Sequence, residues 1–238
     1  MWYDIYNIFK ILFIQLLKFI GCYNNTLNYN KEIEITIKNF NKIKNNTIYR
    51  TTNDIGTLFR KKKIKKKSGF SLDNLNGIIH LDIKNKTIDV GSKTRFYDIL
   101  NETLKYGLMP KIVPELSSIT VGGAISGVAI ESSSFKYGWV HDTVVDIDVL
   151  TSSGNVLYCT RDNENSDLFN SLPNAYGTLG YVTRVKLELI ESKKNVIIIN
   201  KSFKNTQQAF NFMEKIVNEN SCDFLEAVCY SKNDIVVS

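Results

Sequence analysis

Hydrophobic side chains recur at helical spacing in the segment KEIEITIKNFNKIK, residues 31–44. Ile33, Ile37 and Phe40 are three or four positions apart, so they share one face of a helix. A second helix is expected within residues 92–110, where the periodicity is clearest. Its apolar face consists of Phe96, Ile99, Leu100 and Leu104.

The ends of this second helix also carry sequence signals. Ser92 or Thr94 can accept a hydrogen bond from a first-turn amide, which predicts one of them as the N-cap. Gly107 and Pro110 follow the apolar face. Glycine favours the left-handed residue after a helix and proline cannot continue one, so the helix should end there.

Short runs rich in β-branched and aromatic residues predict strands in the rest of the chain. The turn TSSGN should join two of these strands as a hairpin, and Asn165 or Ser166 should cap a short helix at residues 165–172. A longer helix is expected at residues 206–220. The expected strands are residues 47–52, 77–83, 86–91, 143–150, 155–160, 181–190, 195–203 and 223–231, which together with the helices predict an α+β fold.

The N-terminal residues 1–22 form a separate apolar segment with polar residues on one side. Its longest uncharged run, residues 11–17, is much shorter than the roughly 20 apolar residues that a membrane span requires. An amphipathic helix lying in a membrane interface is the preferred interpretation. A weak signal anchor and a helix packed on its own domain remain as alternatives.

Composition and charge indicate a globular protein and bear on its possible partners. The chain has 238 residues, 43% of them hydrophobic, which is enough to bury a core. The net charge of +6 accompanies a general abundance of Lys, Asn and Ile, so no nucleic-acid partner is expected. The basic run RKKKIKKK at residues 60–67 is either a solvated loop or an anion contact.

Several common sites are missing from the sequence. The four cysteines show no metal-ligand spacing and the chain has only two histidines, so no metal site is expected. No GxGxxG, GxxxxGK[ST] or GxSxG motif occurs, which argues against a Rossmann domain, a P-loop and an α/β-hydrolase elbow.

The segment TVGGAISGVAIESSS, residues 120–134, is the strongest candidate site. Each of Gly122, Gly123 and Gly127 would cost about 1 kcal/mol against alanine inside a helix, so a loop is expected here. A loop with little side-chain bulk can present successive backbone N–H groups to a pyrophosphate. The other interpretation of these residues alone is a tight turn beside a closely packed strand.

The surrounding motifs carry a family resemblance. The segments PELSSITVGG, GVAIESSSFKYG, NENSDLF and GTLGYV resemble the FAD-binding domain of the vanillyl-alcohol oxidase/p-cresol methylhydroxylase (PCMH) superfamily, and within it the Δ24-sterol reductase group. The resemblance covers residues 31–238 and is most specific over the central 80 or so. It implies an α+β, PCMH-type FAD-binding domain of two small α/β subdomains, followed by the start of a C-terminal cap.

The resemblance also implies an activity. The expected function is a flavin-mediated hydride transfer to a C=C bond of a sterol-like substrate, with non-covalent FAD and NADPH as a candidate electron donor. The implied domains are residues 1–22 as a membrane-associating helix, 31–192 as the FAD-binding domain and 193–238 as an incomplete cap or substrate domain. Members of the group continue well beyond this point, and an uncapped flavin would be open to water and oxygen.

Two other interpretations stay open. One is a truncated flavin-binding protein with little or no catalysis, and the other is a membrane-peripheral binding module. Membrane association is the expected location, with a cytoplasmic protein as the alternative.

Carried over residue by residue, the resemblance implies a set of cofactor-binding positions. Lys136, Tyr137 and Gly138 would form the turn that returns the chain to the sheet. Glu131, Tyr137 and His141 are the candidate catalytic residues, because each has a side chain that can donate a proton. The cofactor-binding candidates are Thr120, Val121, Gly122, Gly123, Ala124, Ile125, Ser126, Gly127, Val128, Ala129, Ile130, Glu131, Ser132, Gly138, Gly177, Thr178, Gly180 and Tyr181.

Overall fold

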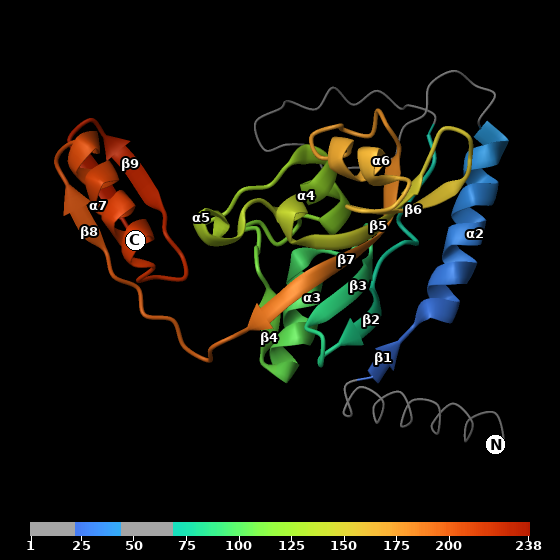
Figure 1. The fold of residues 1–238 in the computed structure, drawn as a ribbon, viewed down its shortest axis with the longest axis horizontal. Coiled ribbons are helices and arrows are strands. Elements are labelled where there is room, and N and C mark those ends of the chain that lie inside the picture. Colours follow the sequence, from blue (N-terminus) through green and yellow to red (C-terminus); the bar gives the residue numbers. More distant parts are fainter. Residues whose placement is uncertain (1–21, 44–68) are drawn as a thin grey trace.

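A computed structural model describes residues 22–43 and 69–238 of the chain (Figure 1). The predicted N-terminal amphipathic helix, the strand at 47–52 and the basic run at 60–67 lie outside these residues. None of the helices within the described residues is long and apolar enough to cross a bilayer.

An antiparallel sheet of seven strands forms the centre of the fold. Its order is β1-β2-β3-β7-β5-β6, and β4 pairs with the far end of β7. The predicted hairpin is confirmed, because β5 and β6 pair on either side of the TSSGN turn. The strands are β1 (Cys22–Asn24), β2 (Ile78–Asp82), β3 (Thr87–Gly91), β4 (Leu108–Pro110), β5 (Val144–Leu150), β6 (Val156–Thr160) and β7 (Tyr181–Glu191).

One face of the sheet carries the main hydrophobic core. Alternate residues of β3 and β7, including Ile88, Val90 and Val185, point into it and are fully buried. The helices α3 (Phe96–Thr103), α4 (Val121–Gly127) and α6 (Ser166–Ser171) contribute buried side chains to the same core. The short elements η1 (Leu104–Tyr106), α5 (Ser134–Tyr137) and η2 (Val140–Thr143) connect them.

Helix α2 (Thr26–Ile43) packs on a second cluster at the other face of the sheet. The predicted apolar face is confirmed, because Phe40 is fully buried with Ile33 and Ile37 packed around the same cluster. The ring of Phe70 joins the helix to the sheet, with its centroid 5.1 Å from Phe40 and 4.9 Å from Tyr181.

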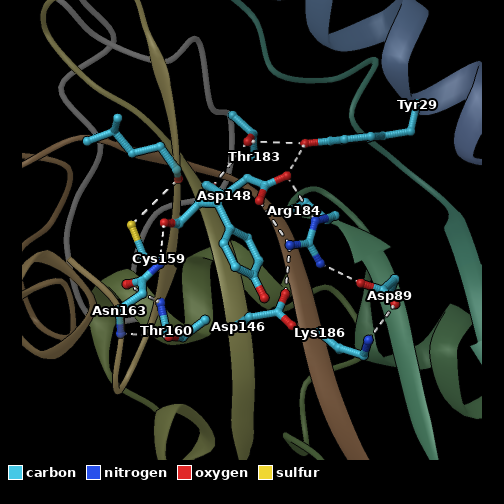
Figure 2. A network of polar contacts seen from close by, with 12 residues as sticks. Tyr29, Asp89, Asp146, Asp148, Cys159, Thr160, Asn163, Thr183, Arg184 and Lys186 are labelled. Atoms are coloured by element: carbon cyan, nitrogen blue, oxygen red, sulfur yellow. Dashed lines mark hydrogen bonds and ion pairs between the residues drawn. The ribbon is translucent and has the colours of Figure 1, made fainter. Parts of the chain in front are cut away.

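A buried ionic network occupies the same face of the sheet (Figure 2). Arg184 on β7 forms ion pairs with Asp89 on β3 and with Asp146 and Asp148 on β5. The hydroxyl of Tyr29 on α2 donates to Asp148 at 3.2 Å. Burial, and next the Asp148 carboxylate, hold the pKa of Tyr29 well above its usual value, so this phenol stays a hydrogen-bond donor.

A second, smaller unit follows β7. Strands β8 (Lys201–Phe203), β10 (Asp234–Val237) and β9 (Ala227–Ser231) pair in that order, and α7 (Thr206–Glu219) packs on them. Among the described residues, three polar contacts join this unit to the larger one. The Leu225 amide donates to the Ser132 carbonyl at 2.9 Å, and Lys136 Nζ pairs with Asp223 at 3.1 Å and donates to the Cys222 carbonyl at 3.4 Å.

Several local predictions are wrong. Arg95, and not Ser92 or Thr94, is the N-cap of α3. The Thr94 hydroxyl instead accepts from the Gly77 amide at 2.8 Å, which ties the loop before β2 to the end of β3. Leu104 falls in η1 and is exposed, because the α-helix ends one residue earlier.

Two further corrections concern the second half of the chain. Asn165 is the N-cap residue of α6, but its side chain donates to the Tyr158 carbonyl instead of capping the helix. The strand predicted at 195–203 is reduced to β8, and the apolar residues before it are irregular and exposed.

Candidate functional site

The glycine-rich segment forms a short helix and not the expected loop. Helix α4 begins at Val121 with Thr120 as its N-cap, and the Thr120 hydroxyl accepts from the Gly123 amide at 3.3 Å. All three glycines of the segment therefore lie within one helix of two turns. Tertiary packing outweighs their low helix propensity.

Gly122 serves a close approach between two backbones. Its amide donates to the Ser92 carbonyl at 2.9 Å, and the Val121 amide donates to the Thr94 carbonyl at 2.9 Å. A Cβ atom at position 122 would lie 2.9 Å from Ser92 Cβ and 3.0 Å from its carbonyl oxygen. These two amides are used inside the protein, so the expectation of successive unblocked N–H groups is wrong here.

The C-terminal end of α4 leads into a strained connection. Val128 has φ 61° and ψ 127°, a conformation that a β-branched residue rarely adopts. Ile130 follows with 65% of its surface exposed. The hydroxyls of Ser126 and Ser132, both partly exposed residues, make no hydrogen bond to another described residue.

The second predicted group of cofactor-binding residues lies against this end of α4. The Tyr176 amide donates to the Ser126 carbonyl at 3.0 Å, which places the turn containing Gly177 and Thr178 next to the glycine-rich segment. Tyr176 and Leu179 expose large apolar surfaces on this turn. The two groups, about 50 residues apart in the sequence, are therefore brought together.

Two members of that group face elsewhere. Gly180 has φ 153°, and a Cβ atom there would lie 2.7 Å from Val149 Cγ1, so glycine is required for packing on the sheet. The Tyr181 ring packs against Phe70 in the cluster under α2. The predicted KYG turn ends α5, with Gly138 in a positive-φ conformation.

Glu131 has the most perturbed environment of the three catalytic candidates. Burial raises the pKa of its carboxyl, and the nearby Glu115 and Glu226 carboxylates add to this effect. A hydrogen bond from the Glu115 backbone partly offsets it. Glu115 was missed by the sequence prediction, because nothing in the sequence shows that residues 115 and 131 are neighbours.

Tyr137 and His141 lie in other surroundings. The Tyr137 ring contacts Lys111, whose Nζ is 5.9 Å from the ring centroid. His141 lines a pocket beside η2 with Arg161. No hydrogen bond among the described residues joins any two of the three catalytic candidates.

This arrangement fits a flavin nucleotide in its composition. Ser126 near the end of α4 contacts the backbone of Tyr176, whose side chain is exposed, so a hydroxyl and an aromatic ring are available to a ligand with polar and aromatic parts. No group of His, Cys, Asp and Glu residues within the described ranges is suited to holding a metal ion.

A family model described as an FAD binding domain matches residues 56–160. This part of the chain is an FAD-binding domain of that family. The match includes β2 to β6 and the whole glycine-rich segment, and the α+β architecture agrees with a PCMH-type FAD-binding domain.

Curated relatives agree with this assignment. A Delta(24)-sterol reductase of Pisum sativum is 32% identical over 170 residues, which are 67% of this chain and 30% of the relative. The Rattus norvegicus Delta(24)-sterol reductase is 30% identical over 178 residues, 74% of this chain and 34% of the relative. Cytokinin dehydrogenase 1 of Arabidopsis thaliana is 36% identical over 106 residues, 44% of this chain and 18% of the relative. The chain spans about a third of the length of the sterol reductases that it matches.

Proposed function

We propose that the chain is part of an FAD-dependent oxidoreductase that transfers a hydride to a C=C bond of a sterol-like substrate. The proposal rests above all on the contact between α4 and the 174–178 turn, where Ser126, whose hydroxyl bonds no described residue, meets the backbone of the exposed Tyr176. The similarity to Delta(24)-sterol reductases supports the class of substrate.

The chain's own residues would bind and orient the cofactor, and FAD would supply the hydride chemistry when it is bound. Ser126 and Ser132 would donate hydrogen bonds to its polar parts, while Ile130 and Tyr176 would contact its apolar surface. Gly122 acts indirectly by allowing α4 to approach Ser92.

Glu131 is the best-supported proton donor among the three candidates. Its raised pKa keeps a larger share of the carboxyl protonated near neutrality than an exposed glutamate would have. The Glu131 amide donates to Ser134 Oγ at 2.9 Å, which fixes the backbone that carries the carboxyl.

FAD titration of the purified chain tests the cofactor site. The wild-type protein should bind FAD saturably, with quenching of flavin fluorescence, and the double variant Ser126→Ala/Ser132→Ala should bind more weakly. A matched double variant, Ser152→Ala/Ser202→Ala, removes two exposed hydroxyls elsewhere and should bind like wild type. Acid precipitation should release the FAD, since non-covalent binding is expected.

Anaerobic reduction separates catalysis from simple flavin binding. NADPH should bleach the bound flavin, and a sterol with a side-chain double bond should then reoxidise it with formation of the saturated product. A protein that binds FAD but supports neither step is a flavin-binding protein without this activity. A protein that takes up no FAD contradicts both proposals.

We also propose membrane association through residues 1–22, of which residues 1–21 lie outside the described part of the chain. Flotation of the full chain with anionic liposomes, lost when these residues are deleted, is the expected result. Equal flotation of the deleted and full chains would contradict it.

A further inference from the structure

A separate pocket of about 170 Å³ lies between η2, β5 and α6. Its apolar wall includes Ile125, Ile147 and Phe169, and its polar groups include Arg161 and His141. Neither Ser126 nor Ser132 lines it, so it differs from the surface proposed for FAD, although the buried Ile125 of the predicted cofactor-binding segment forms part of its wall. Its size suits a small ligand, since a cavity of about 150 Å³ holds benzene in another protein.

Arg161 is held in place without a counter-ion. Its Nη2 donates to the backbone carbonyls of His141 at 3.4 Å and Asp142 at 3.0 Å. The guanidinium carbon lies 5.3 Å from the centre of the Phe169 ring. Within the described part of the chain, no carboxylate lies at ion-pair distance from Arg161. The pocket therefore is lined by an oriented positive charge whose Nε and Nη1 make no hydrogen bond or ion pair to a described residue.

His141 adds a second unsatisfied polar group. Its Nδ1 is buried and has no hydrogen-bond partner among the described residues, a condition that costs free energy unless a ligand or water satisfies it. The imidazole also contacts the Trp139 ring, with centroids 5.7 Å apart.

Asp142 is the acidic group at the rim, and it has another role. One of its carboxylate oxygens accepts from the Trp139 amide at 2.8 Å, which holds the start of η2. The other lies 3.8 Å from His141 Nε2. Asp142 therefore leaves the Arg161 guanidinium available.

We propose that this pocket binds a small planar carboxylate, such as an aryl carboxylate. The carboxylate pairs with the guanidinium of Arg161, and the planar apolar body lies against Phe169 and Ile147. The carboxylate is inferred from the Arg161 guanidinium, which has no ion pair among the described residues, and the planar apolar body is inferred from the apolar wall beside it. The site does not depend on FAD.

Benzoate is the probe for this proposal. Calorimetric titration of the full chain should show saturable binding, accompanied by a change in tryptophan emission, since the Trp139 ring contacts the His141 imidazole. The Arg161→Met variant keeps the apolar stem over Phe169 and should weaken binding by about tenfold or more, as loss of a charged hydrogen bond predicts. Lys84→Met, which removes a positive charge from the exposed turn after β2, should leave binding unchanged.

Two further measurements keep the test decisive if Arg161→Met folds poorly. Asn170→Asp places a negative charge on the exposed rim of the pocket and should also weaken benzoate binding. Benzamide, which has the same shape without the charge, should bind more weakly than benzoate to the wild-type chain. Absence of saturable benzoate binding, or equal affinity in Arg161→Met, overturns the proposal. Failure of FAD binding alone leaves the benzoate result unchanged, so the two proposals are distinguished.

Discussion

The Arg184 guanidinium on β7 lies beside the Asp148 carboxylate on β5, with Nε 2.9 Å from Oδ2. The two residues are directly opposite each other in the antiparallel register. Asp89 and Asp146 contact the same guanidinium, whose side chain is only 12% exposed. One arginine thus forms ion pairs with carboxylates from both neighbouring strands of β7, and Figure 2 shows these side chains converging on it.

Replacing Arg184 by methionine should therefore destabilise the fold strongly. The variant leaves three aspartates close together in a buried place, and removing one partner of a buried ion pair typically costs about 3–5 kcal/mol. Urea unfolding followed by circular dichroism measures the loss. Lys186→Met is the matched control, because Lys186 is more exposed and contacts only Asp89 at 3.6 Å. Equal losses in the two variants would contradict this account of the network.

The glycines of α4 should respond differently to alanine. Gly122→Ala should destabilise the protein, because the new Cβ would meet Ser92 backbone atoms that cannot move independently of the sheet. Gly127→Ala should be neutral or stabilising, since its Cβ would lie 3.9 Å from the Tyr176 ring. Thermal unfolding of the two variants tests this, and a larger loss in Gly127→Ala would show that the close approach lies elsewhere.

Val128 offers a test of backbone strain. Val128→Gly should be more stable than Val128→Ala, by about 1 kcal/mol, because glycine adopts a positive φ without the Cβ penalty. Both variants lose the valine side chain, so their difference isolates the backbone. Chemical denaturation gives the two free energies of unfolding, and the usual order, with alanine more stable, would argue against strain at this residue.

The Glu131 carboxyl predicts a pH dependence of stability. Burial raises its pKa above the ordinary value of 4.5, so the folded protein holds this proton to a higher pH than the unfolded chain does. The stability that the protonated Glu131 carboxyl contributes is therefore complete below the ordinary pKa of the unfolded chain. It is lost as the pH rises through the higher pKa of the folded protein. Glu131→Gln should be more stable than wild type at neutral pH, and the difference should vanish in acid. A difference that grows on acidification would contradict the sign of the shift.

Cysteine reactivity should follow burial. Cys159 is fully buried, and desolvation, followed by the nearby Asp148 carboxylate, raises its thiol pKa to about 11. Cys229 is exposed on β9. Iodoacetamide followed by mass spectrometry should modify Cys229 in the folded protein and Cys159 only after denaturation, because the thiolate is the reactive form. Modification of Cys159 at a rate similar to Cys229 would contradict its burial.

Local hydrophobic periodicity was sufficient to predict the helices and strands that bury one face. The α2 helix, the β5–β6 hairpin and the long β7 strand were predicted because alternate or helically spaced apolar residues identify one buried face. Helix caps were predicted less well. The Thr94 hydroxyl accepts a hydrogen bond from the Gly77 amide, and the Asn165 side chain donates one to the Tyr158 carbonyl. These partners lie outside the helices concerned, so a rule that considers only the residues at a helix end cannot predict that they compete with capping.

The candidate site was likewise predictable from the sequence only in part. The sequence motifs predicted an FAD-binding domain, and the family match includes the glycine-rich segment at residues 120–134. Tertiary contacts decided which backbone and side-chain groups of these segments are already bonded or packed inside the protein. The Gly122 amide is taken by Ser92, Tyr181 packs against Phe70, and Glu115 lies close enough to Glu131 to raise its pKa.

The sequence by itself thus determined the α+β class, most of the elements and the region of the chain that matches the FAD-binding family, since periodicity and motifs are properties of neighbouring residues. Only the tertiary structure decided which side chains meet. Strand register placed three aspartates around Arg184, and the packing of α4 against Ser92 turned a glycine-rich stretch into a helix. Both depend on contacts between residues far apart in the chain, where a backbone approach of a few ångströms decides which groups are satisfied and which remain for a ligand.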